Sequence, residues 1–183
     1  MMIKNLSSRR LITLFLAASV AILLLILSKE VRALLFIFAF LGLNSVITLY
    51  KRYVYLPIEI EVLSFGIVFT TVAFGLKAGI AVGMLGSILL TILTTSFSPF
   101  TIPMFIGYVV MACVAFMLNF LFPQIPYPYI GIIANISHNI LVFSLYHIFL
   151  GYDPVKNLMF GISNILFNIF LFLNFGNLIF SLL

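Results

Sequence analysis

Three stretches of this chain carry polar side chains at helical spacing within apolar sequence, and any chemistry must be sought there. Residues three or four apart lie on the same face of a helix. The stripes comprise Glu61, Ser64 and Thr71; Asn135, His138, Asn139 and Tyr146; and Asn157, Gly161, Asn164 and Asn168. A carboxylate, amides, an imidazole and a phenol can together hydrogen-bond a small polar or aromatic solute. The candidate solute-binding residues are therefore Glu61, Ser64, Asn135, His138, Asn139, Tyr146, Asn164 and Asn168.

The same inventory argues against an enzyme and against a resident cofactor. No nucleophile, base and acid occur in a recognisable arrangement, and no His, Cys or Asp cluster has metal-ligand spacing. Glu59 and Glu61 are two residues apart, so on a helix their carboxylates would point away from each other. No phosphate-binding loop is present, which excludes an ATP-driven pump acting by itself. We predict no catalytic residues, no metal site and no cofactor.

Each stripe also has a structural interpretation, which the sequence leaves open. Asn and Ser side chains often hydrogen-bond neighbouring helices in membranes, and His138 could be a satisfied core histidine. His147 lies off the stripe near a helix end, where an interfacial role is expected. Glu59 and Glu61 follow Pro57 in what we expect to be the first turn of a helix, where acidic side chains complement the helix dipole.

The elements that position these residues must lie in lipid. The chain has 183 residues, of which 64% are hydrophobic and only 7% are charged, whereas soluble domains carry roughly 25% charged residues. We therefore expect a single integral membrane domain over residues 1–183, with a basic tail at 1–10, that passes the cell membrane several times. The fold class is an all-α polytopic transmembrane helix bundle. At about 20 residues per span, the length allows six or seven helices.

Seven apolar segments qualify as spans, and their flanking charges bear on orientation. The segments are 11–27, 33–50, 58–74, 78–95, 104–122, 129–150 and 157–183. Lys and Arg are enriched in cytoplasmic loops. With seven spans and a cytoplasmic N-terminus, six cations fall inside (Lys4, Arg9, Arg10, Lys51, Arg52 and Lys156) and three outside (Lys29, Arg32 and Lys77). The cations thus mark segment ends, and we expect the lipid bilayer, and no nucleic acid, as partner.

Small residues identify the expected packing surfaces. The third and fourth segments are joined by a tight turn flanked by Gly75 and Gly79, and Gly79, Gly83 and Gly86 share one face of the fourth segment. Small residues at this spacing let helix backbones approach closely in a bilayer. We expect the remaining helices to pack around this hairpin. Ala17 and Ala21 form a similar pair on the first segment.

The stretch LPIEIEVLSFGIVFTTVAFGLKAGIAVGMLGSILL resembles the membrane-embedded substrate-binding subunits (S components) of energy-coupling factor transporters. Phe74, Gly75, Gly79 and Gly83 match the FGxxxG-type turn of that family, and Asn164 and Asn168 match an Asn near the start of its last helix. The resemblance covers roughly 51–183. It implies a vitamin-like molecule or a metal bound in a pocket open to the outside, together with a transmembrane coupling subunit and two cytoplasmic ATPases. It also implies that Ala17 and Ala21 contact the coupling subunit.

The chain departs from that family in ways that keep a second interpretation open. Members of the family usually have six helices. If the glycine turn is their cytoplasmic turn, then segment 33–50 is their first helix, segment 11–27 is additional, and Arg9 and Arg10 lie outside, against the charge bias. The chain also resembles, more distantly, the rod-shape-determining MreD family, which would imply a scaffold or assembly protein without a ligand.

The two functions differ in one structural feature, a polar cavity, which a binding subunit requires and a scaffold fills with apolar side chains. We expect the pocket among the third, sixth and last spans. It should lie at the end of the bundle where residues 56–61 and the turn at Asp153 are found, roofed by residues 51–57 and 151–156.

Overall fold

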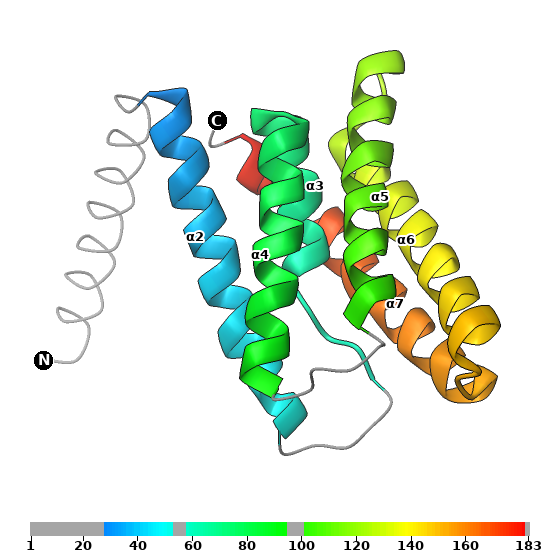
Figure 1. Ribbon diagram of the computed structural model, residues 1–183. Coiled ribbons are helices and arrows are strands. Elements are labelled where there is room, and N and C mark those ends of the chain that lie inside the picture. Colours follow the sequence, from blue (N-terminus) through cyan, green and yellow to red (C-terminus); the bar gives the residue numbers. More distant parts are fainter. Residues whose placement is uncertain (1–27, 53–57, 95–100, 182–183) are drawn as a thin grey trace, which may run out of the picture.

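A computed structural model describes residues 28–52, 58–94 and 101–181, and this part of the chain is a bundle of helices without strands (Figure 1). The elements are α2 (Lys29–Thr48), η1 (Leu49–Arg52), α3 (Leu63–Phe74), α4 (Leu76–Thr94), α5 (Thr101–Leu121), α6 (Tyr127–Leu150) and α7 (Pro154–Phe180). All of these α-helices except α3 are long and apolar enough to cross a membrane. The predicted fold class, a polytopic transmembrane helix bundle, is confirmed. The expected first span at 11–27, with Ala17 and Ala21, lies outside the described residues.

Helix α3 is the centre of the bundle. It has 12 residues, which makes it roughly 18 Å long, and it packs against α2, α4, α5, α6 and α7. Leu63, Ile67, Val68 and Phe69 have no accessible surface. A helix that is apolar on all sides is stable only where every side is covered. The other described α-helices therefore pack around the hairpin mainly through α3, while α2 and α5 also contact α4.

The glycines of α4 allow this close packing, as the sequence predicts. A Cβ atom on Gly79 would lie 1.7 Å from Oγ1 of Thr71, and one on Gly86 would lie 2.2 Å from Cδ1 of Leu63. Gly83 faces α5, because its Cβ would lie 3.0 Å from Cβ of Tyr108. The turn itself is one residue, Gly75, whose φ of 102° is a conformation that side-chain-bearing residues rarely adopt.

The predicted start of the third span at Ile58 is wrong, because α3 begins only at Leu63. Residues 58–61 precede the helix, so Glu59 and Glu61 do not occupy its first turn. The backbone N–H groups find partners elsewhere: that of Glu59 donates to Oγ of Ser163 over 2.8 Å. Those of Val62 and Leu63 donate to Oδ1 of Asn44, over 3.0 and 3.2 Å. Asn44 on α2 thus supplies the N-terminal cap of α3.

The other spans differ from prediction by a few residues at their ends, where local caps decide. Helix α2 begins at Lys29, since Oγ of Ser28 accepts from the N–H of Val31 over 3.4 Å. Helix α7 begins at Pro154, since Oδ1 of Asp153 accepts from the N–H groups of Val155 and Lys156 over 2.8 and 3.3 Å. Parts of the two predicted connections, residues 28–32 before α2 and 151–156 before α7, are therefore helical.

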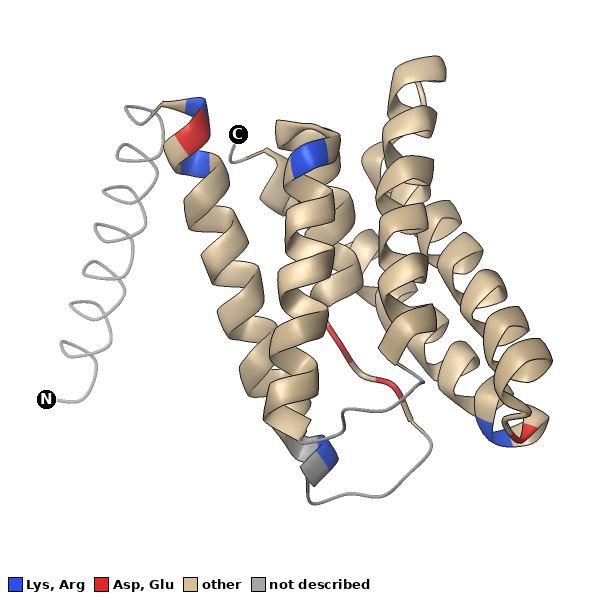
Figure 2. Cartoon of the chain, viewed as in Figure 1, with Lys and Arg blue, Asp and Glu red and all other residues tan. Residues whose placement is uncertain are grey.

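Lys and Arg residues lie at the two ends of the described bundle, as expected for helices that cross a bilayer, whereas Glu59 and Glu61 lie in the segment before α3 (Figure 2). One end holds Lys29, Arg32 and Lys77 at the starts of α2 and α4. The other holds Lys51, Arg52 and Lys156, in η1 and at the start of α7. The described part of the chain thus has equal numbers of cations at both ends. The six-to-three bias rests on Lys4, Arg9 and Arg10, which lie outside it.

Candidate solute-binding site

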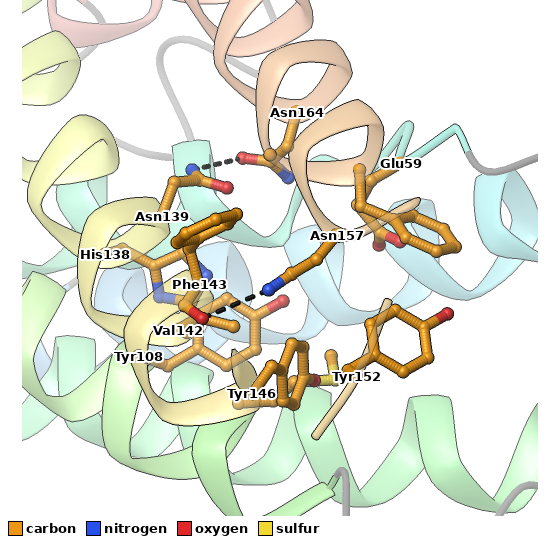
Figure 3. A pocket seen from close by; sticks show the side chains of 13 residues that line it. Glu59, Tyr108, His138, Asn139, Val142, Phe143, Tyr146, Tyr152, Asn157 and Asn164 are labelled. Carbon is orange, nitrogen blue, oxygen red and sulfur yellow. Dashed lines mark hydrogen bonds between the residues drawn. The ribbon is translucent and has the colours of Figure 1, made fainter. Parts of the chain in front are cut away.

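A cavity of about 420 Å³ opens between α5, α6 and α7 at the end of the bundle where α7 begins (Figure 3). Its lining residues are mainly polar or aromatic: Glu59, Met104, Tyr108, His138, Asn139, Val142, Phe143, Tyr146, Tyr152, Asn157, Phe160, Gly161 and Asn164. The cavity lies at the end of the bundle where the pocket was predicted, and it is lined by two of the predicted helices, α6 and α7. Helix α5 was not predicted to take part, and α3 itself contributes no lining residue.

Directly behind the cavity wall lies the carboxylate of Glu61, which is completely buried. Oε1 accepts hydrogen bonds from Nδ2 of Asn164 over 3.1 Å, from the backbone N–H of Ser64 over 3.3 Å, and from the hydroxyl of Ser64. Oε2 accepts from the hydroxyl of Tyr108 over 3.2 Å. Glu61 thus joins a residue of α5 and one of α7 to the N-terminus of α3, where a negative charge is favoured by the helix dipole.

The amides of α6 and α7 form a second layer around Asn164. Oδ1 of Asn164 accepts from Nδ2 of Asn135 and from Nδ2 of Asn139, over 2.9 Å each. Asn168 approaches the same oxygen from 3.4 Å and donates to the backbone carbonyl of Asn164 over 3.1 Å. The side-chain oxygen of Asn164 therefore accepts hydrogen bonds from α6, while its side-chain nitrogen donates to Glu61. In this way Asn164 connects the two layers. The cluster holds α6 and α7 together by hydrogen bonds that need no water.

Two aromatic rings form the wall between the cavity and α5. Tyr108 is stacked on the imidazole of His138, with ring centroids 4.6 Å apart and planes 11° apart. Both side chains are buried. This contact is possible because Gly107 leaves room for the imidazole: a Cβ there would lie 2.6 Å from Nδ1 of His138.

Part of the predicted residue set lines the cavity and part lies behind it. His138, Asn139, Tyr146 and Asn164 line the cavity. Glu61, Ser64, Asn135 and Asn168 are buried in the network behind it. Thr71, in the predicted α3 stripe, instead donates to the carbonyl of Ile67 and packs on Gly79. His147 is exposed, and its interfacial role stays a prediction.

The sequence analysis missed Tyr108 and Tyr152 as lining residues. The sequence did contain a signal for Tyr108: Met104 and Tyr108 are four residues apart and therefore share one face of a helix. In the structure, both residues line the cavity. Tyr152 belongs to the turn between α6 and α7 that was expected to roof the pocket.

The fold and the cavity define a multi-pass helical membrane protein with a cavity whose wall carries several polar side chains. Comparison with family models, with curated proteins and with solved structures gives no significant match to the chain. The functional argument therefore rests on the geometry of the site and on the motifs of the sequence.

Proposed function

We propose that this chain is the solute-binding subunit of an uptake system in the cell membrane, of the type found in energy-coupling factor transporters. The observation that carries the proposal is the cavity of about 420 Å³ between α5, α6 and α7. Pockets for small organic ligands typically occupy about 300–1,000 Å³ and combine apolar walls with a few placed polar groups. The lining supplies both kinds of surface. It suits a vitamin-sized molecule better than a bare metal ion, because no group of three His, Cys, Asp or Glu in the described part could hold one.

The energy for uptake must come from partner proteins. The sequence contains no phosphate-binding loop. In the proposed system, a transmembrane coupling subunit and cytoplasmic ATPases supply it, and the cavity end of the bundle faces outward to collect solute. The FGLKAG turn at Gly75, at the opposite end, then faces the cytoplasm, as the resemblance implies.

The alternative function, an MreD-like scaffold, does not need a cavity. A scaffold would be expected to fill this space with the Phe and Leu side chains that the chain has in abundance. Phe143 and Phe160 do line the space, but they leave it open beside Asn139, Asn157 and Asn164. An open cavity with a few polar groups in its largely apolar wall is what favours solute binding over a scaffold.

A cavity-filling variant tests the proposal. Gly161 lines the cavity, and a Cβ there would meet only Oδ1 of Asn139, at an ordinary 3.7 Å. Gly161→Leu should therefore fill the cavity and leave the bundle intact. We expect native mass spectrometry of the wild-type protein to detect a bound small molecule, and Gly161→Leu to reduce its occupancy roughly tenfold or more, since a factor of ten needs only about 1.4 kcal/mol.

Gly42→Leu is the matched control, because Gly42 lies exposed on α2 with no atom near its added Cβ. This variant should retain the molecule as the wild type does, with a similar unfolding temperature. Protein that carries no molecule when purified from its native membrane, or equal retention in both variants, would contradict the proposal and favour the scaffold.

A further inference from the structure

We propose that the solute held in this cavity is an organic cation, namely a small aromatic or heteroaromatic molecule with a positively charged nitrogen. This inference rests on the proposed function and narrows it to a substrate class. It is argued from three features of the cavity: the atoms that its wall leaves free, the balance of charge around it, and its aromatic surfaces.

The first feature is the orientation of Asn139, whose amide nitrogen is fully engaged by the protein. Nδ2 donates to Oδ1 of Asn164 over 2.9 Å (Figure 3). It also donates to the backbone carbonyl of Asn135 over 2.9 Å. A backbone carbonyl can only accept, so the nitrogen must stand where it is placed. Oδ1 of Asn139 is the atom nearest the space beside Gly161, and Asn139 therefore offers the solute an acceptor.

The hydroxyl of Tyr108 and the amide of Asn157 are oriented in the same way. Tyr108 donates its single hydroxyl hydrogen to Oε2 of Glu61, so the hydroxyl can act toward a solute only as an acceptor. Nδ2 of Asn157 donates to the carbonyl of Phe143 over 3.1 Å, which fixes the amide and leaves Oδ1 on its other side. The second amide hydrogen of Asn157 could still be donated to a solute. The other two polar groups, Oδ1 of Asn139 and the hydroxyl of Tyr108, offer only acceptors, which match N–H donors on a solute.

The second feature is the pair of carboxyl groups beside the cavity. Glu59 is the only charged side chain among the described lining residues, and it forms an ion pair with Lys51. Glu61 lies behind Tyr108 and Asn164, and no Lys, Arg or His within the described ranges forms an ion pair with it. A cation in the cavity would therefore lie close to two carboxyl groups, of which only Glu59 is paired with a cationic side chain in the described part of the chain.

The third feature is the aromatic surface. Tyr108, Phe143, Tyr146, Tyr152 and Phe160 line the cavity on several sides. Aromatic faces attract cations, and the attraction grows when both are removed from water. An anionic solute would meet these aromatic faces, the acceptor atoms and the carboxylate of Glu59, none of which favours a negative charge. The three features favour the same class of solute.

Three probes of nearly the same shape test the charge preference. They are the N-methylnicotinamide cation, the neutral meta-methylbenzamide and the anionic meta-methylbenzoate, each offered to the purified full-length chain in equilibrium dialysis. We expect the cation to bind at least about tenfold more tightly than the neutral probe, and the anion to bind most weakly. Equal binding of the cation and the neutral probe, or no binding of the cation, would overturn the inference.

Charge-neutralising variants identify the source of the preference. Glu59→Gln and Glu61→Gln should each lower affinity for the cation roughly tenfold more than they lower affinity for the neutral probe. Asp153→Asn is the matched control: it removes an exposed acidic charge from the same end of the bundle, Asn also caps helices, and the residue does not line the cavity. If Asp153→Asn lowers affinity for the cation as much as Glu59→Gln does, the inference is overturned. The preference would then come from the overall negative charge at this end of the bundle and not from the cavity wall.

The charge of the retained molecule separates this inference from the proposed function. A molecule found by native mass spectrometry and lost in Gly161→Leu supports solute binding whatever its charge. If that molecule is neutral or anionic, the cation inference fails and the proposed function stands.

Discussion

At the scale of single residues, Asn164 is the side chain on which the site depends. It connects Glu61 of the segment before α3 to Asn135 and Asn139 of α6, and it also lines the cavity. Removal of a partner from a buried hydrogen-bonded group costs more than the bond contributed, because the remaining group is left without water. Asn164 is therefore both a structural and a solute-facing residue, and the two interpretations of its stripe are not exclusive.

Leu substitutions at the two asparagines of α7 should differ in their cost. Asn164→Leu leaves Glu61, Asn135 and Asn139 each short of a partner, and we expect it to lower the free energy of unfolding by about 2 kcal/mol or more. Asn168→Leu should cost less, because Oδ1 of Asn168 has no partner among the described residues and its amide nitrogen serves Asn164 alone. Unfolding titrations in SDS measure both values. Equal costs would mean that the network does not converge on Asn164.

Residue patterns predicted the amide stripes correctly because helical spacing is a local property. Asn135 and His138 of α6 are buried, as are Asn164 and Asn168 of α7. The roles of Asn44 and Tyr108 could not be found in this way. Asn44 acts on the backbone of α3, and Tyr108 acts on Glu61, which is 47 positions away in sequence. A residue whose partner lies on another helix is invisible to a pattern that describes one helix.

At the scale of helices, the close approach of α4 to α3 predicts that a side chain at Gly79 destabilises the bundle. A Cβ there would lie 1.7 Å from Oγ1 of Thr71 and 3.1 Å from the backbone oxygen of Ile67, so the helices would have to separate. We expect Gly79→Ala to lower the free energy of unfolding by about 1–3 kcal/mol, the usual cost of overpacking. Gly83→Leu should act similarly through Tyr108.

The control for these variants is Gly42→Ala. Gly42 is exposed within α2, so an added methyl group meets no atom and should raise stability by up to about 1 kcal/mol through helix propensity. Unfolding of all three variants can be followed by the same SDS titration. A Gly79→Ala protein as stable as Gly42→Ala would mean that α3 and α4 are not in close contact.

Element boundaries were predicted less well than element identity, and α3 shows why. The sequence from Ile58 to Val62 is apolar apart from its two acids and continues directly into the helix, so nothing local marks a break. The break arises because Ser163 and Asn44 accept the backbone N–H groups that a longer helix would have used. A capping partner from a distant helix decides where α3 begins.

At the scale of the whole molecule, the short central helix creates the site. The hydrocarbon core of a bilayer is about 30 Å thick, whereas 12 residues of α3 cover roughly 18 Å. At the end of the bundle that α3 does not reach, the chain from Ile58 to Glu61 and the cavity occupy the interior (Figures 1 and 3). A central helix of full length would fill this space with side chains.

The orientation of the bundle is the decisive whole-molecule prediction, since α7 must place Asp153 and Ser181 on opposite sides of the membrane. In a Cys113→Ala background, Asp153→Cys and Ser181→Cys can be labelled in intact cells with a membrane-impermeant maleimide. Uptake requires the cavity end to face outward, so we expect Asp153→Cys to react and Ser181→Cys to react only after the cells are opened.

The reverse pattern would match the six-to-three charge count, with seven spans and a cytoplasmic N-terminus, and would contradict uptake. Ser8→Cys completes the test, although Ser8 lies outside the described residues. Ser8 and Ser181 on the same side would mean an even number of spans, as in the six-helix pattern of the resemblance. Opposite sides would mean seven, and an outward cavity would then place Arg9 and Arg10 outside, against the charge bias. Because the described bundle carries equal numbers of cations at its two ends, only labelling of this kind separates the two orientations.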